Sequence, residues 1–127
     1  MCLDTGRALK GTSKEWVPAW KEVMEWGEVF CTPYRLIELR RANIIPPGRE
    51  DFCLPFADHP KPNTYKTGFH AWLKRPPRNA QCSDTTKVVR VFLRKLTARG
   101  KQGGAGCIVG REMRVPYLKK DGTRKKQ

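Results

Sequence analysis

The segment Lys87–Thr97 (KVVRVFLRKLT) restricts the fold more than any other part of the chain. Val89, Val91 and Leu93 alternate with charged or aromatic residues, and a period of two is typical of a strand with one buried face. We therefore expect the two valines and the leucine to enter a core. The side chains expected on the opposite, outer face are Arg90, Phe92 and Arg94.

A second alternating segment, Cys107–Leu118, follows closely enough to pair with the first. The residues between them, 98–106 (ARGKQGGAG), predict a β-hairpin with a long, flexible, glycine-rich loop. Gly104–Gly110 resembles a dinucleotide-binding glycine motif, but three residues precede its last glycine and a strand pattern follows. Because a pyrophosphate site needs a helix N-terminus at that point, no nucleotide cofactor is expected.

The segment Lys14–Phe30 fits two structures. Trp16 and Trp20 recur at helical spacing, whereas residues 20–26 alternate as a strand does. The tryptophan content slightly favours the strand. Residues 36–39 are compatible with a single helical turn. The ten prolines and eleven glycines of the chain predict short elements joined by many turns.

These patterns together predict an α+β fold, with mostly short antiparallel strands and long Pro/Gly-rich loops. We expect one compact domain over residues 1–118, in which 1–13 form a loosely ordered lead-in, and a disordered basic tail at 119–127. The chain has no run of about 18 apolar residues, which argues against a membrane partner. Its first residues lack the apolar core of a signal peptide, which favours a cytoplasmic location.

The excess of positive charge comes from the second half of the chain. Residues 1–65 hold nine Lys or Arg and nine Asp or Glu, whereas residues 66–127 hold 17 and three and supply the entire net charge of +14. A field of one sign on this scale attracts polyanions by steering and counterion release. Nucleic acid or a nucleoprotein complex is the expected partner. The alternatives are an acidic protein and a merely solubilising surface; the sequence indicates no oligomeric state.

The cysteine pattern indicates neither a metal site nor a disulfide framework. The five cysteines stand at positions 2, 31, 53, 82 and 107, with no CxxC pair. Zinc sites use closely spaced ligand pairs, and an odd count leaves at least one thiol outside any set of disulfides. No metal and no cofactor are expected.

The basic hairpin carries the candidate binding residues. Arginines beside an exposed aromatic ring suit single-stranded nucleic acid, because the ring stacks on a base while guanidinium groups bind phosphates. Phe92 is the ring between two arginines, and Trp72 is a second candidate for stacking. If Phe92 were buried against another layer, only a charged edge would remain. The predicted nucleic-acid-binding residues are Arg75, Arg78, Arg90, Phe92, Arg94, Arg99, Lys101, Arg111 and Arg114.

His70 is the residue around which an enzyme site is conceivable. It stands between Phe69 and Ala71, so its ring is expected to be at least partly buried. A catalytic histidine needs an orienting carboxylate or a nucleophile within reach. A buried structural histidine bonded to the main chain is the commoner arrangement, and we favour it. The candidate catalytic partners of His70 are Tyr34, Tyr65, Glu112 and Cys31.

Three short stretches occur in a suggestive order: the opening Met-Cys-Leu, then Thr32-Pro33-Tyr34, then residues 68–72 (GFHAW). In this the chain resembles a set of small bacterial and bacteriophage proteins with an opening Met-Cys-Leu, a Ser/Thr-Pro-Tyr and a Gly-Phe-His-Ala-aromatic motif. The resemblance implies a phage or prophage origin, the cytoplasm of a bacterial host and a mainly β domain. It implies no established activity, so it assigns no catalytic residue.

The first functional hypothesis is a phage-encoded accessory protein that binds nucleic acid or a nucleoprotein complex through its basic C-terminal half. A specific version is inhibition of a host defence or nucleic-acid-processing machine. One alternative is a small transferase or hydrolase with a pocket around His70. The other is a protein-interaction module that docks on an acidic partner. The balance of these patterns favours a protein that is not an enzyme.

Overall fold

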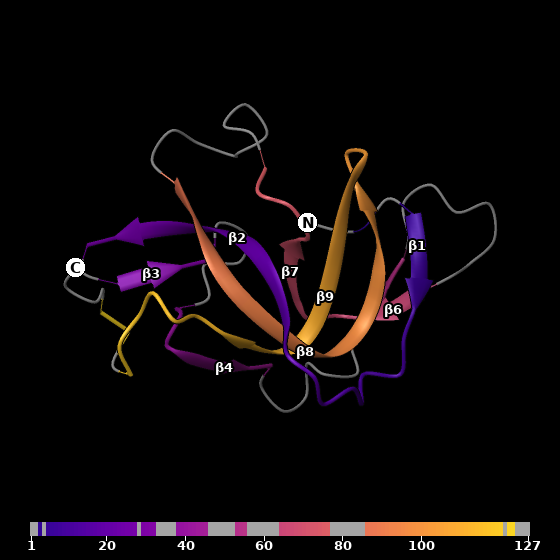
Figure 1. The fold of residues 1–127 in the computed structure, drawn as a ribbon, viewed down its shortest axis with the longest axis horizontal. Helices are drawn as coiled ribbons and strands as arrows, with labels where there is room; N and C mark the ends of the chain where they lie inside the picture. Colours follow the sequence, from indigo (N-terminus) through magenta and orange to yellow (C-terminus); the bar gives the residue numbers. More distant parts are fainter. Residues whose placement is uncertain are drawn as a thin grey trace.

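The computed structural model describes residues 3, 5–27, 29–32, 38–45, 53–55, 64–76, 86–120 and 122–123, with the backbone alone for residues 26 and 53–55. This part of the chain contains nine strands and no helix (Figure 1). The strands are β1 (Thr5–Ala8), β2 (Val17–Trp26), β3 (Val29–Cys31), β4 (Ala42–Ile44), β5 (Cys53–Pro55), β6 (Thr64–Lys66), β7 (Phe69–Trp72), β8 (Thr86–Gln102) and β9 (Ala105–Arg114).

The α+β prediction is therefore wrong, and the fold is mostly β. The segment for which helix and strand were both open became β2, a ten-residue strand. It pairs with β8 over eight consecutive residues, from Val17 opposite Leu93 to Met24 opposite Thr86. This pairing stabilises the extended conformation, whereas Pro18 would remove a hydrogen bond from a helix. The described residues contain no helix that could cross a membrane.

The β8–β9 hairpin confirms the predicted strand pair but not its loop. The two strands continue to Gln102 and from Ala105, so only Gly103 and Gly104 form the turn. Their φ angles are +59° and +81°, and a two-residue hairpin turn requires such positive values, which glycine adopts without strain. The prediction of a nine-residue loop was wrong. Glycine has no side chain, so the alternation of polar and apolar side chains that marks a strand is hard to recognise in residues 98–106, although most of them pair.

All pairings of the seven-stranded sheet are antiparallel, and four of its strands form a closed ring. Strand β8 pairs with β2 and with β9, and β9 also pairs with β7. The ring closes where Trp20 of β2 lies opposite Trp72 of β7. Strands β1, β3 and β4 extend the sheet at its edges, and β5 and β6 form a separate two-stranded sheet.

Side chains from all four ring strands meet in one apolar cluster, which therefore lies inside the ring. Val91 and Leu93 of β8 are fully buried there and Val89 is 9% exposed, so the predicted inner face of this strand is confirmed. The other members are Ala19, Val23, Phe30, Leu39, Ile45, Phe69, Ala71, Ile108, Met113, Val115 and Leu118. A smaller cluster contains Leu3, Tyr65, Trp72, Ala98, Cys107 and Val109.

Strand β8 bends sharply, and Figure 1 shows this long strand turning back at the bottom of the view. Lys95 has a φ of +55°, and a register shift follows between Leu96 and Ala98. A bulge of this kind re-aims a strand at the cost of local pairing. Ser13 compensates, because its carbonyl accepts from Lys95 N at 2.8 Å and its Oγ accepts from Leu96 N at 3.0 Å.

Parts of the predicted lead-in and of the predicted tail lie among the described residues. Within the lead-in, Thr5–Ala8 form β1, which pairs with the far part of β8, and Leu9 N donates to Thr97 O at 2.8 Å. At the other end Lys119 N donates to Thr123 O at 2.7 Å, which closes a turn. Residues 121 and 124–127 of the predicted tail lie outside the described residues.

Candidate nucleic-acid interface

Three rows of side chains cover the outer face of β2, β8 and β9, because residues directly opposite in a ladder share a face. In the first row Trp20 lies opposite Arg90. In the second, Phe92 lies between Pro18 on β2 and Arg114 on β9. Successive rows are two residues, or about 7 Å, apart along a strand.

In the third row Arg94 lies opposite Glu112 and contacts Trp16, just before the start of β2. We call this surface the arginine–tryptophan face. Its members are Trp16, Trp20, Arg75, Arg90, Phe92, Arg94 and Arg114.

Each tryptophan of the face is stacked by two arginines. The guanidinium carbons of Arg90 and Arg75 lie 4.1 and 5.2 Å from the centre of the Trp20 ring. Those of Arg94 and Arg114 lie 4.4 and 4.5 Å from the Trp16 ring. A stacked guanidinium group keeps its N–H donors at its rim, so it can still bind a phosphate in two-point fashion.

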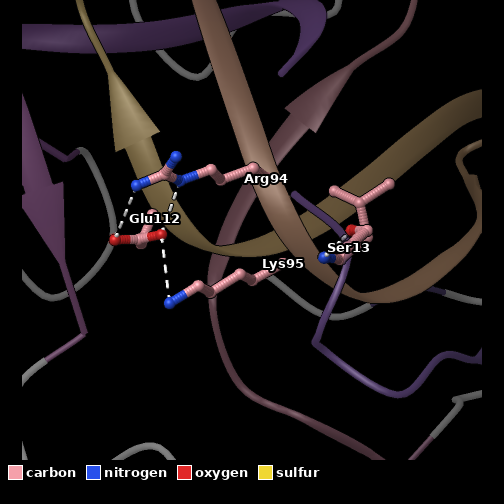
Figure 2. A network of polar contacts seen from close by, with 5 residues as sticks. Ser13, Arg94, Lys95 and Glu112 are labelled. Atoms are coloured by element: carbon pink, nitrogen blue, oxygen red, sulfur yellow. Dashed lines mark hydrogen bonds and ion pairs between the residues drawn. The ribbon is translucent and has the colours of Figure 1, made fainter. Parts of the chain in front are cut away.

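Glu112 makes Arg94 different from the other arginines of the face. Figure 2 shows Arg94 and Lys95 converging on the Glu112 carboxylate. Arg94 Nε donates to Oε2 at 2.7 Å and Nη2 to Oε1 at 3.4 Å, while Lys95 Nζ lies 3.5 Å from Oε2. The hydrogen bond from Arg94 lowers the pKa of Glu112, with the positive charges of Arg94 and Lys95 adding to the effect. The carboxylate of Glu112 thus neutralises the positive charge of Arg94.

Three arginines of the face are free of carboxylates within the part of the chain that the structure describes. Arg75, Arg90 and Arg114 are exposed, and none of them takes part in a described ion pair. The nearest acidic residue along β2, Glu22, is 2% exposed and accepts from Thr86 Oγ1. The face therefore offers positive charge beside half-buried indole rings.

The structure divides the nine predicted binding residues among several places. Five lie on the arginine–tryptophan face, with Phe92 half-buried between arginines. Arg99 and Lys101 are exposed on the far part of β8, beyond the bend. Arg111 is half-buried, with its Cδ beside Gly11, and so stands apart from the face. Arg78 lies outside the described residues.

Sequence reasoning missed Trp16 and Trp20 as partners of these arginines. They lie 55 to 98 residues from these arginines, and the pairing of β2 with β8 and β7 and of β8 with β9 brings them together. One signal was present: Trp16, Pro18 and Trp20 are two residues apart, as residues on one strand face are. Trp72, the predicted alternative stacking surface, is 8% exposed and belongs to the smaller apolar cluster.

His70 joins β6 to β7 through its ring nitrogens. Nδ1 lies 3.2 Å from the Gly68 carbonyl, which can only accept, so Nδ1 carries the proton and Nε2 accepts from the Tyr65 hydroxyl at 3.0 Å. The Tyr65 oxygen in turn accepts from Leu3 N at 2.9 Å. Both ring nitrogens thus have partners of the kind expected for a structural histidine.

The other candidates for catalysis are dispersed among the described residues. Glu112 is bound to Arg94 and Lys95, and Tyr34 lies outside the described part of the chain. Cys31 is 7% exposed; burial, reinforced by the charge of Glu38, raises the pKa of its thiol and so disfavours the nucleophilic thiolate. The described residues include no group of three or more His, Cys, Asp or Glu placed to hold a metal ion.

Comparisons of this chain with protein-family models, with curated proteins and with solved structures each gave no match. The function must therefore be inferred from the chemistry of the site itself.

Proposed function

We propose that this protein binds single-stranded nucleic acid through the arginine–tryptophan face. The observation that carries the proposal is the double stacking of arginines on Trp16 and Trp20 beside arginines that no described carboxylate neutralises. Bases stack on aromatic rings and also on the planes of arginine guanidinium groups, so each half-buried indole with its two arginines offers a stacking surface, while the N–H donors at the guanidinium rims bind phosphates. A single strand is favoured over a duplex because its bases can leave their own stack to reach these surfaces.

The salt dependence of binding follows from the number of free arginines. Arg75, Arg90 and Arg114 would neutralise about three phosphates, and each displaced phosphate counterion contributes roughly −0.7 to the slope of log K against log salt for single strands. The expected slope is about −2, so affinity falls roughly 15–20-fold between about 50 and 200 mM salt. Binding that does not change over this range contradicts the proposal.

Two substitutions separate stacking from charge in a fluorescence-anisotropy titration with labelled oligothymidylate. Trp20→Ala removes one stacking ring, and the loss of about 1–3 kcal/mol per base corresponds to roughly 5- to 150-fold weaker binding. Arg90→Gln weakens binding and reduces the salt slope by about 0.7. Lys120→Gln removes an equal charge from an exposed residue that belongs to none of the three rows, and it serves as the matched control.

The outcome that refutes this assignment is equal weakening by Arg90→Gln and Lys120→Gln, which would show that only net charge matters. Tight duplex binding that Trp20→Ala leaves unchanged refutes the preference for single strands. A phage origin, which the sequence resemblance implies, and inhibition of a host machine, which is the specific version of the first functional hypothesis, remain proposals. Pull-down from a bacterial lysate with and without nuclease tests whether a host complex is bound, because a complex held together by nucleic acid is lost after nuclease treatment.

A further inference from the structure

Beyond the bend of β8, three cations project from one face of the β1–β8 pair. Arg7 lies directly opposite Arg99, and Thr5 lies opposite Lys101. Directly opposed residues, and residues two apart on one strand, point to the same side of a sheet. Arg7, Arg99 and Lys101 are all exposed. We call these three residues the β1 cation cluster.

The fold holds the two arginines together although like charges directly opposite each other are unfavourable. The strands approach so closely at the neighbouring Gly6–Gly100 pair that a Cβ on Gly100 would lie 1.9 Å from Thr5 O. The register is thereby fixed, and the arginines cannot move apart by a shift of one strand. Within the described part of the chain, no ion pair involves either arginine.

A phosphate group is the ligand that fits this arrangement. Its oxygens accept from two guanidinium groups at once, and Lys101 adds a third positive charge. The three positive charges repel one another when no ligand is bound. A bound anion therefore stabilises the cluster more than it would stabilise the same three charges far apart. No described carboxylate competes for the two arginines, in contrast to Arg94, which Glu112 holds.

We propose that the β1 cation cluster is a second phosphate-binding site, distinct from the arginine–tryptophan face and used by the same bound strand. This rests on the proposed function. Figure 1 shows β1 beside the far part of β8, at the opposite end of the molecule from β3. Arg94 and Arg99 are five residues apart, about 16 Å along an extended strand and less along a bent one. A strand that reaches both sites must therefore be longer than one that fills the first.

The test is a length series of labelled oligothymidylates, each with and without a 5′-phosphate, titrated against the wild type, Arg7→Gln/Arg99→Gln and Lys120→Gln. If an internal phosphodiester occupies the cluster, the double variant binds short oligomers like the wild type. On long oligomers it loses about 1.4 from the salt slope and at least tenfold in affinity. If a terminal phosphate occupies it, the loss instead appears on short oligomers that carry the 5′-phosphate.

Two outcomes separate failure of this inference from failure of the proposed function. The inference is overturned if the double variant matches the wild type on every oligomer while Trp20→Ala weakens them all. If no oligomer binds the wild type, the proposed function fails, and tripolyphosphate then tests the cluster alone. It should raise the melting temperature of the wild type more than that of the double variant, and an equal rise refutes the site. The double variant is expected to fold, because it removes two positive charges that repel each other on an exposed face.

Discussion

The ion pair of Glu112 gives the sharpest prediction about the stability of this fold. Replacing Glu112 by Gln keeps the shape of a side chain that is 12% exposed but removes its charge. The amide can still accept from Arg94 Nε through its oxygen. Its NH₂ group, however, then takes the place of Oε1 and faces the Nη2 donor of Arg94, while Lys95 loses its negatively charged partner.

The expected loss of stability is set by hydrogen bonds to charged groups, which contribute about 1.5–3 kcal/mol in folded proteins. For a chain of this size that corresponds to a fall in melting temperature of roughly 5–12 °C. Glu25→Gln is the matched control. Its partner Lys87 lies at 3.7 Å and both side chains are 43% exposed, so the loss should stay below about 1 kcal/mol.

The effect depends on pH in a defined direction. Because the pKa of Glu112 in the folded protein lies below its ordinary value of 4.5, the folded state favours the ionised form. The stabilisation is complete above pH 4.5 and disappears as the pH falls through the lowered pKa. Urea unfolding of the wild type and Glu112→Gln at neutral and acid pH measures this. A stability difference that is the same at both pH values, or no larger than that of Glu25→Gln, would refute the reasoning.

Three further substitutions test the architecture. Gly100→Ala should detach β1, because no Cβ fits beside Thr5 O, and the amides of β1 should then exchange hydrogen like those of an unpaired segment; persistent protection would contradict the close approach. Met113→Ala should cost about 2–5 kcal/mol in urea unfolding, since Met113 is fully buried, and a loss below 1 kcal/mol would mean the core is looser than described. Tyr65→Phe should cost about 1–3 kcal/mol by the same assay, because Leu3 N loses its acceptor, and an unchanged midpoint would argue against that bond.

The sequence identified the local features of the sheet and missed those that depend on register. The inner face of β8 was predictable, because Val89, Val91 and Leu93 alternate with polar residues and the burial follows that pattern. The hairpin was predictable as well, but not its two-residue turn. The expected α+β class was wrong because periodicity alone did not distinguish helix from strand in residues 14–30, which contain β2. The helical turn expected at 36–39 begins outside the described residues.

The candidate interface was predictable in its charge but not in its geometry. Local alternation placed Arg90 and Arg94 on an outer face, yet it left open whether Phe92 was exposed or covered. The neutralisation of Arg94 by Glu112 depends on the register of the β8–β9 hairpin, which the wrongly predicted loop length concealed. The stacking of Arg94 on Trp16 joins segments 78 residues apart, and the linear order of residues does not state that such segments will be neighbours.

The β8–β9 hairpin also determines when the rest of the chain can fold. Its two strands are joined by two glycines, so they meet with little loss of loop entropy and can form early. Strands β1 and β2 pair with β8, and β4 and β7 pair with β9. During synthesis most of the strands that precede β8 therefore lack the surface on which they assemble until β8 and β9 have left the ribosome. A sheet of this connectivity is completed from its C-terminal end, opposite to the direction of translation.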